Sequence, residues 1–396
     1  MVKAYFDNSA TTMVDPRVVE AMMPYFTEKY GNASSLHSFG RDAYNALETA
    51  RGQTAKAIGS AARDIIFTSG GTESDNLALQ GVAYAAMAKG KHIITSAVEH
   101  HAVIHACQFL ESQGFKVTYL PVDAEGMVSI EDLKAAMTKE TTLVSIMVAN
   151  NEIGSIQPIR EMAEVAKDGG ALFHTDAVQA ITKIPIDVEK LKIDLLSLSA
   201  HKFHGPKGVG AMYIRKGVKI RPIVYGGGHE RGIRSSTENI PGIVGLGKAI
   251  EVGMMEMEES AARMIKIRDH LIEGTLAAVP RSYLNGPRGE RRLCNNAHFR
   301  FDFIEGEGLI LYLDMKGVAG STGSACSTRS LEPSHVLRSL GLRHEQCHGS
   351  LRLSLSKFNT MEEADHLLSV LPPIVQTLRK MSPLAEGVSY NVTSVH

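Results

Sequence analysis

Short apolar runs alternate with stretches of helical periodicity from residue 64 to residue 214, and this alternation constrains the fold more than any other feature. The apolar runs have the length of strands and span residues 64–68, 91–96, 116–120, 142–149, 171–174, 195–198 and 209–214. Helices are predicted between them, near residues 73–89, 101–113, 130–137 and 159–167. Strands that alternate with helices form a mainly parallel sheet with helices on both faces, so the sequence predicts an α/β fold.

Polar clusters follow several of these apolar runs. Their members are Thr72, His100, Asn151, Asp176 with Gln179, and Lys202. In open α/β sheets, ligands bind beyond the carboxyl ends of the strands. We therefore expect these side chains to converge on one pocket at that edge of the sheet.

Lys202 stands at the end of an apolar run, in the sequence Ser199-Ala200-His201-Lys202, and a glycine-rich turn follows it at 205–208. Lysines rarely lie buried without a partner. In a poorly solvated pocket the pKa of the amine falls, and the neutral amine can form a Schiff base with an aldehyde. The alternative is an exposed loop lysine, because loops are usually solvated.

The turn Ser69-Gly70-Gly71-Thr72 joins a predicted strand to a predicted helix. Backbone N–H groups and the helix dipole make such a turn a good anion site. The pattern is not GxGxxG and lacks the GK[ST] ending of a nucleotide P-loop, so it suits a single phosphate monoester better than a dinucleotide. An ordinary turn without a ligand is the alternative.

Outside this region, strands are expected at 4–6, 296–302 and 350–354, and helices at 17–30, 41–58, 241–279, 307–314 and 360–381. The long helical stretch 241–279 is expected to connect to a second domain. A glycine-rich segment over 225–239 holds Arg231 and Arg234 and suits an anion-binding loop. The small-residue loop VAGSTGSACSTR, residues 318–329, carries Cys326.

Composition excludes several classes of function. The 396 residues are 44% hydrophobic and 21% charged, which predicts two or more domains. The net charge of −1 and the lack of a basic stripe argue against nucleic-acid binding. The sequence has no apolar run of membrane-spanning length and no signal-peptide core at the N-terminus. Its four cysteines form no CxxC pair, which indicates reduced thiols in a cytoplasmic protein.

Four of these groups match the requirements of pyridoxal phosphate. The aldehyde of this cofactor needs a lysine, its ring nitrogen a carboxylate, its phosphate a helix N-terminus with hydroxyls, and its ring an aromatic partner. Lys202, Asp176, the Gly71–Thr72 turn and His100 provide these groups in one α/β region.

Nearly the whole chain resembles the fold-type I pyridoxal phosphate-dependent transferases, and closely the group I cysteine desulfurases of iron–sulfur cluster assembly. The motifs that carry the resemblance are DNSATT, TSGGTESDN, EHHAV, NNEIG, HTDAVQ, SAHKFHGPKG, GGGHERGIRSST, GSACS and LEPSHVLRSLG. The resemblance implies an aspartate aminotransferase-like fold. A large domain, 15–260, would hold a mainly parallel seven-stranded sheet, and a smaller α+β domain, 1–14 with 261–396, would carry the catalytic cysteine loop 318–333.

The resemblance also implies a role for each matching residue. The lysine of the Schiff base is Lys202, the partner of the ring nitrogen is Asp176, and His100 stacks on the ring and moves protons. The remaining cofactor contacts are Asn151 and Gln179 on the hydroxyl side of the ring, and Gly71, Thr72, Ser199 and His201 at the phosphate. Thr237 reaches the phosphate of a neighbouring subunit, which implies a homodimer. The substrate carboxylate binds Arg352, near Asn151, in a bidentate manner.

The implied reaction converts L-cysteine to L-alanine. The Cys326 thiolate takes the substrate sulfur as a persulfide and passes it to an acceptor, with an iron–sulfur scaffold protein expected. Whether Cys326 also ligates a cluster during transfer stays open. Ser236 stands where the family often has glycine, and the tail lacks tryptophan, so the docking of the tail on a scaffold stays open as well.

Other interpretations exist for several features. Another fold-type I enzyme, such as an aminotransferase or a selenocysteine lyase, would need no loop cysteine, and a non-catalytic scaffold would need none of these groups. Cys326 would then be a small buried side chain. His344, Cys347 and His348 have helical spacing, but no further ligand is evident, so no metal site is predicted. His101 and His105 are expected on a helix face.

Overall fold

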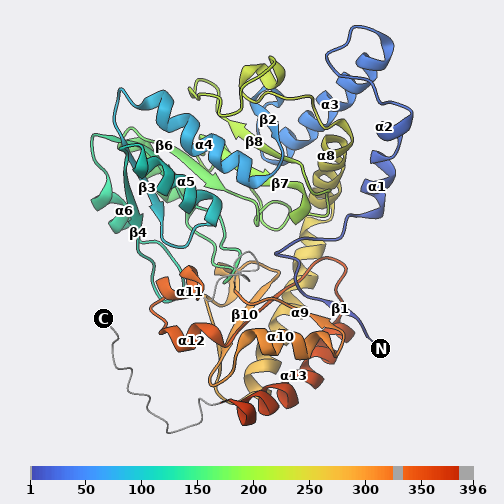
Figure 1. The fold of residues 1–396 in the computed structure, drawn as a ribbon, viewed down its shortest axis with the longest axis vertical. Helices are drawn as coiled ribbons and strands as arrows, with labels where there is room; N and C mark the ends of the chain where they lie inside the picture. Colours follow the sequence, from blue (N-terminus) through green and yellow to red (C-terminus); the bar gives the residue numbers. More distant parts are fainter. Residues whose placement is uncertain (1, 324–332, 383–396) are drawn as a thin grey trace.

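The computed structural model describes residues 2–323 and 333–382, and its centre is a twisted sheet of seven strands (Figure 1). The strands lie in the order β2 (Ile65–Thr68), β8 (Gly210–Ile214), β7 (Leu195–Ser199), β6 (Leu172–Asp176), β5 (Thr141–Ser145), β3 (His92–Ser96) and β4 (Lys116–Leu120). All neighbours are parallel except β8, which is antiparallel to both β2 and β7. The predicted mainly parallel sheet is thus confirmed.

Alternate residues of each strand pack on opposite faces of this sheet. Leu195 of β7 belongs to one buried cluster, with α4 (Gly71–Ala86) and α5 (His101–Ser112). Its neighbour Leu196 belongs to the other, with α3 (Ser38–Ala57), α6 (Ile130–Ala136), α7 (Ile159–Asp168) and α8 (Ile240–Met255). The period of two along a strand explains this division. Because both faces are covered, β2, β3, β5, β7 and β8 are buried along their whole length.

A second hydrophobic core lies below the first in Figure 1. Its sheet has β10 (Asn296–Phe301) between β9 (Ser282–Leu284) and β12 (Ser350–Ser354), all antiparallel. The helices against it are α9 (Met257–Ala278), α10 (Gly306–Asp314) and α13 (Met361–Met381). The N-terminus joins this core, because β1 (Ala4–Tyr5) pairs with β11 (Val318–Ala319) and Phe6 is fully buried in the cluster. This packing supports the division at residues 15 and 260, which stays a prediction.

A small cluster joins the two cores. Val98 and Ile153 from loops of the large sheet pack against Val336 and Leu337 of α11 (His335–Ser339) and Cys347 of α12 (His344–His348). The chain passes between the cores through the consecutive helices α8 and α9, which Figure 1 shows as one long connection. The edge of the large sheet where β6 and β7 end therefore faces the second core.

Two predicted helices are interrupted in the structure. The helix expected over 17–30 forms as α1 (Pro16–Met22) and α2 (Pro24–Thr27), because Pro24 has no N–H for the intrahelical bond. The stretch expected over 241–279 is α8 and α9, which meet at Glu256. Among the described residues, no helix is long and apolar enough to cross a membrane.

Candidate active site

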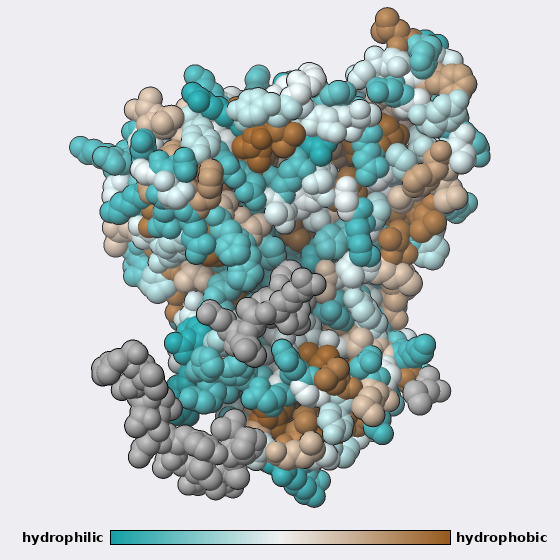
Figure 2. All heavy atoms as spheres, in the orientation of Figure 1, coloured by the Kyte–Doolittle hydropathy of each residue, from teal (hydrophilic) through white to brown (hydrophobic). Residues whose placement is uncertain are grey.

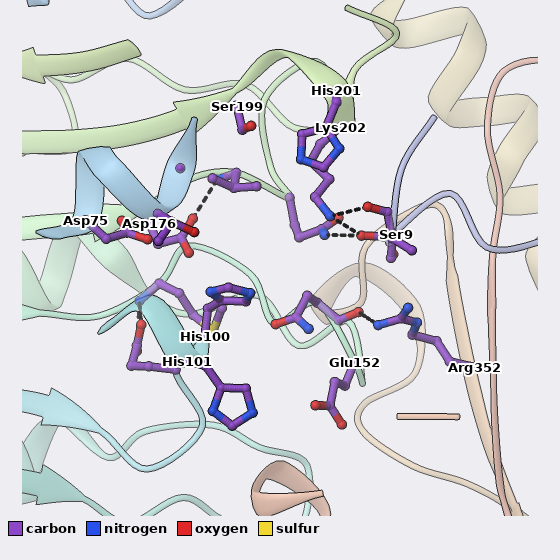
Figure 3. A pocket seen from close by; sticks show the side chains of 18 of the residues that line it. Ser9, Asp75, His100, His101, Glu152, Asp176, Ser199, His201, Lys202 and Arg352 are labelled. Atoms are coloured by element: carbon purple, nitrogen blue, oxygen red, sulfur yellow. Dashed lines mark hydrogen bonds between the residues drawn. The ribbon is translucent and has the colours of Figure 1, made fainter. Parts of the chain in front are cut away.

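A cavity of about 400 Å³ opens at the carboxyl ends of β6 and β7, between the two cores. Its lining includes ten of the predicted site residues: Gly71, Thr72, His100, Asn151, Asp176, Gln179, Ser199, His201, Lys202 and Arg352. Figure 3 shows Asp176 on one side of this cavity, with Lys202 and Arg352 on the other. The expected convergence of polar clusters that lie far apart in the sequence is therefore seen in the structure.

Lys202 ends a single turn of 3₁₀ helix, Ala200–Lys202, directly after β7. Its Nζ donates to the carbonyl oxygens of Ser9, at 2.5 Å, and Ala10, at 2.7 Å. The backbone is held as well, because the carbonyl oxygen of Lys202 accepts a hydrogen bond from Nζ of Lys183 at 3.1 Å. The side chain is thus partly buried, and both its amine and its backbone are held by hydrogen bonds.

Asp176 is the last residue of β6 and is buried. Burial raises the pKa of its carboxyl to about 6, although the Val178 N–H, at 2.8 Å, and the charge of Lys202 act in the opposite direction. At neutral pH the carboxyl is therefore ionised and faces the cavity. A cationic ring nitrogen would find its counter-charge there.

His100 is the N-cap of α5, and its Nδ1 accepts the N–H of Ala102 at 3.1 Å. Burial lowers the pKa of the imidazole to about 4, and the charge of Lys202 contributes to the shift. The ring is thus neutral at pH 7, and its exchangeable proton is on Nε2 because Nδ1 is the acceptor. This arrangement leaves Nε2 available to exchange a proton with a bound ligand.

The first turn of α4 presents N–H groups that could hold an anion in the cavity. Gly71 begins the helix, whose first N–H groups have no intrahelical acceptor. A Cβ at Gly71 would lie 2.7 Å from Cγ2 of Val178, so the glycine is required for the close approach of two segments. Ser199 and His201 line the cavity as well. Burial lowers the pKa of His201 to about 4, so it is a neutral hydrogen-bonding group at pH 7.

Arg352 lies on β12 in the second core and is 2% exposed. Its Nη2 pairs with Oδ1 of Asp7 at 3.0 Å, and its Nη1 donates to the carbonyl oxygens of Gly323, at 3.1 Å, and Asn151, at 3.3 Å. Nε has no hydrogen-bond partner among the described residues. A buried guanidinium with an unused N–H fits a carboxylate ligand.

Asn151 and Gln179 complete the predicted set. Nε2 of Gln179 donates to the carbonyl oxygen of Ser9 at 3.0 Å. The Oε1 atom of Gln179 is buried and has no partner in the described part of the chain, so it can accept from a ligand hydroxyl. The N-terminal loop that carries Ser9 therefore contacts both Lys202 and Gln179, although it belongs by packing to the second core.

The structure places five further titratable residues in the cavity wall: Asp75, Glu99, His101, Glu152 and His335. Glu99 precedes His100 in the sequence, and Glu152 follows Asn151. A charged residue next to a predicted site residue was the sequence signal that could have identified these two glutamates. His101 was predicted only as a helix-face residue. The ring of His101 lies 4.7 Å from the ring of His335. No sequence pattern predicts this contact, because His335 belongs to α11, far from His101 in the chain.

The two buried glutamates have different partners. Burial raises the pKa of Glu99 to about 8, and its carboxyl accepts from Oγ of Ser96, at 2.6 Å, and the N–H of Met147. Burial also raises the pKa of Glu152, which accepts from Oγ of Ser334 at 2.6 Å. Ser334 is the N-cap of α11, so Glu152 connects the large sheet to the second core.

Two predictions fall outside the cavity, and a third concerns a residue that the structure does not describe. Thr237 is exposed and is not part of the lining in its own chain. The expected anion-binding loop has its cations engaged, because Arg234 pairs with Glu73 at 2.7 Å and Arg231 donates to the carbonyl oxygen of Ile65. Cys326 lies outside the described residues.

The predicted helical trio on α12 adds no ligand site. Nε2 of His348 hydrogen-bonds Nδ1 of His344 at 3.1 Å, and Cys347 is buried. Within residues 2–323 and 333–382, no group of three or more histidine, cysteine or carboxylate side chains is arranged to hold a metal ion.

The cavity wall fits pyridoxal phosphate. Its phosphate would meet the uncapped N–H groups of α4, its ring nitrogen the ionised Asp176, and its aldehyde the amine of Lys202. The unpartnered Gln179 Oε1 would meet its hydroxyl. Each end of the cofactor thus finds a group of complementary chemistry.

Comparison with known proteins places this cavity in a family. The aminotransferase class-V model matches residues 4–367. The cysteine desulfurase IscS of Methanosarcina thermophila is 59% identical over 380 residues, which cover 96% of this chain and 94% of that protein. The IscS of Clostridium botulinum strain Hall is 57% identical over 390 residues, or 98% of each chain.

Solved structures support the same family assignment. A NifS-like protein superposes with a TM-score of 0.90 at 43% identity, covering 95% of this chain and all of that one. The apo cysteine desulfurase of Thermococcus onnurineus NA1 gives a TM-score of 0.85 at 27% identity, covering 95% of each. The fold is the predicted fold-type I architecture. The chain therefore belongs to the class-V aminotransferase family and, within it, to the cysteine desulfurases.

Proposed function

We propose that this protein is a pyridoxal phosphate-dependent cysteine desulfurase that converts L-cysteine to L-alanine and supplies the sulfur for iron–sulfur cluster assembly. One observation carries the proposal: the amine of Lys202, the carboxylate of Asp176 and the guanidinium of Arg352 line one cavity. The relatives named cysteine desulfurase IscS support the same reaction.

When bound, pyridoxal phosphate supplies an aldehyde for an amine and a ring that withdraws electrons from the α-carbon of an amino acid. Asp176 stabilises the protonated ring nitrogen, because it is buried and ionised at neutral pH. The first turn of α4, with Ser199 and His201, holds the phosphate. Lys202 would provide the amine that binds the aldehyde of the cofactor.

Arg352 binds the carboxylate of L-cysteine. Asp7 fixes one edge of the guanidinium, and the unpartnered Nε remains for the ligand. His100 lies on the opposite side of the cavity with its proton on Nε2, from which it exchanges a proton with the reacting amino acid. Arg352, from the second core, thus orients the substrate, and His100, at the edge of the large sheet, exchanges a proton with it.

Cys326 takes the sulfur in this proposal. Its thiolate attacks the sulfur of the substrate, so that a sulfur–sulfur bond forms while the carbon–sulfur bond breaks. The electron pair of the broken bond stays with the substrate, and a proton added to carbon completes alanine. The cysteines of the described chain are poor candidates for this role, because burial raises the pKa of Cys107 to about 12 and those of Cys294 and Cys347 to about 11.

A homodimer belongs to the proposal. Large apolar side chains are exposed along α1, α2, the start of α3 and the residues that join them, namely Val19, Met23, Phe26, Tyr30 and Phe39. Figure 2 shows hydrophobic surface at the upper right, where Figure 1 places these helices. A second copy would cover this surface, and Thr237 would reach the cavity of the partner. Light scattering that reports a fully active monomer would exclude this arrangement.

The acceptor and the location are proposals as well. An iron–sulfur scaffold protein is the expected sulfur acceptor, because the relatives carry the name IscS. A cytoplasmic location is supported by the free thiols of Cys107, Cys294 and Cys347.

The test follows sulfur from L-cysteine. Holoenzyme incubated with L-cysteine should gain one sulfur atom on Cys326 in peptide mass spectrometry and release alanine and, with a thiol reductant, sulfide. Cys326→Ser should bind L-cysteine, with a change in absorbance, but form almost no alanine, since serine is a poor attacker of sulfur. Cys347→Ser is the matched control and should keep the activity. Alanine released by Cys326→Ser at the wild-type rate would overturn the persulfide mechanism.

A further inference from the structure

A second carboxyl group, that of Asp75, lies in the cavity wall with Asp176 and has no part in the mechanism above. Asp75 belongs to the start of α4, whereas Asp176 ends β6. Figure 3 shows both on the side of the cavity away from Lys202. Asp75 is 1% exposed, so its carboxyl is as isolated from bulk water as a core residue.

The surroundings of Asp75 provide no counter-charge. Its Oδ1 has no hydrogen-bond partner among the described residues. The nearest basic atom is Nε2 of His174, at 3.7 Å, which is too far for a hydrogen bond. His174 is neutral, because burial lowers its pKa to about 3, and its two ring nitrogens already contact Oγ of Ser145 and Oγ of Ser197.

The charged groups that face Asp75 are of the same sign. Burial raises the pKa of Asp75 well above its ordinary value, and the negative charge of Asp176 adds to the shift, as does that of Glu99 once Glu99 ionises. Only the Ser197 hydroxyl opposes it. Asp176 differs, because it accepts the N–H of Val178 and faces the cation of Lys202. Two buried carboxyls in one site rarely ionise together, and the one with more donors keeps the charge.

We propose that Asp75 is a positioning residue that carries the proton of the Asp75–Asp176 pair at neutral pH. The pair then presents a single negative charge to the cofactor, localised on Asp176. This inference rests on the proposed function, since it assigns Asp176 to the ring nitrogen. A neutral Asp75 acts through Asp176: it keeps the second charge out of the site and so sets the strength of the field at the ring nitrogen.

The first test needs no cofactor. The apoprotein at pH 7 should show the infrared carbonyl stretch of a protonated carboxyl, and Asp75→Asn should remove one such component. Glu99→Gln separates the other protonated group, since burial raises the pKa of Glu99 to about 8. A wild-type spectrum that Asp75→Asn leaves unchanged would overturn the proposal, whatever the activity of the enzyme.

The second test uses the stability of the apoprotein. A carboxyl that stays protonated in the fold but ionises in the unfolded chain costs stability above its unfolded pKa. Asp75→Asn should therefore melt at a higher temperature than wild type at pH 7 and at the same temperature near pH 4. An equal or lower melting temperature at pH 7 would mean that Asp75 is ionised in the fold.

The third test measures pyridoxal phosphate itself. Asparagine imitates a neutral carboxyl, so Asp75→Asn should bind the cofactor within about threefold of wild type, whereas Asp176→Asn should bind it at least tenfold more weakly. A tenfold loss in Asp75→Asn would show that the charge of Asp75 is used. Failure of the wild type to bind the cofactor would instead remove the proposed function, while the infrared result would still stand.

Discussion

The two sides of the cavity are built in different ways. On the sheet side, Asp176 ends β6, while His100 and Lys202 lie in the turns that follow β3 and β7. Asp176 and His100 are each fixed by an N–H two residues away. On the opposite side, Arg352 contacts Asp7, Asn151 and Gly323, which are 345, 201 and 29 residues away in the sequence. On the cofactor side, Asp176 and His100 are therefore held by local turns, although the amine of Lys202 reaches the N-terminal loop, whereas the substrate side exists only when the two cores meet.

This difference implies that damage to the two sides has different signatures. Changes on the sheet side should act on cofactor binding and on the absorbance of the holoenzyme. Changes on the second core should act on KM for L-cysteine, or on the docking of the two cores, while the cofactor stays bound. The following experiments test that separation.

Lys202→Ala should have the largest effect. No other amine lines the cavity in the described part of the chain, so the variant should lose the visible absorbance of the holoenzyme together with all measurable alanine formation. Lys207→Ala is the control, because Lys207 is exposed in the following turn and should keep both. Retention of the wild-type spectrum in Lys202→Ala would remove this lysine from the cofactor site.

Arg352→Lys should raise KM for L-cysteine about 10- to 100-fold. Lysine keeps the charge but loses the planar fork, and one charge-assisted hydrogen bond contributes about 1.5–3 kcal/mol. Cofactor affinity, measured by absorbance titration of the apoprotein, should change less than twofold. If the cofactor also dissociates, Arg352 belongs to both sides and the separation of the two sides is wrong.

Cofactor affinity should fall as pH drops below about 6. Burial sets the pKa of Asp176 to about 6, so its negative charge is present above that pH and is lost below it. Because the phosphate of the cofactor also titrates near pH 6, the difference between wild type and Asp176→Asn isolates the carboxyl. Parallel profiles for the two proteins between pH 5 and pH 8 would contradict this role.

Ser334→Ala should have the smallest effect. The change removes an N-cap and leaves the buried carboxyl of Glu152 without its 2.6 Å partner, at a cost of about 1–3 kcal/mol in the free energy of unfolding. Ser129→Ala is the matched control, since Ser129 caps α6 without a buried carboxylate. Equal losses of stability in urea unfolding would show that the contact between Glu152 and Ser334 adds nothing.

The sheet and the cofactor side were predictable from local patterns. Apolar runs of strand length, separated by helical periodicity, are enough to predict a parallel sheet, and polar residues after each run mark its carboxyl edge. Gly71, His100, Asp176 and Lys202 were found in this way. The break at Pro24 was also readable from the sequence, because proline has no N–H, but the prediction continued the helix through it.

The remaining site residues gave no local signal. His335 reaches the cavity on a short helix of the second core, and His101 was indistinguishable from any residue on a helix face. Asp75 lies three residues beyond Thr72, the last residue of the predicted anion-binding turn, and its isolation is visible only as a buried oxygen without a partner. Burial and the pKa shifts that follow from it depend on what packs against a residue.

The sequence by itself determined the fold class, the family and the groups for cofactor chemistry, because these depend on periodicity and on residues that stand at strand ends. Only the tertiary structure decided which charges meet. It brought Arg352 to Asp7, Glu152 to Ser334, and Asp75 into the same wall as Asp176. The physical reason is that a charge takes its properties from its neighbours in space, and in this protein those neighbours come from segments hundreds of residues apart.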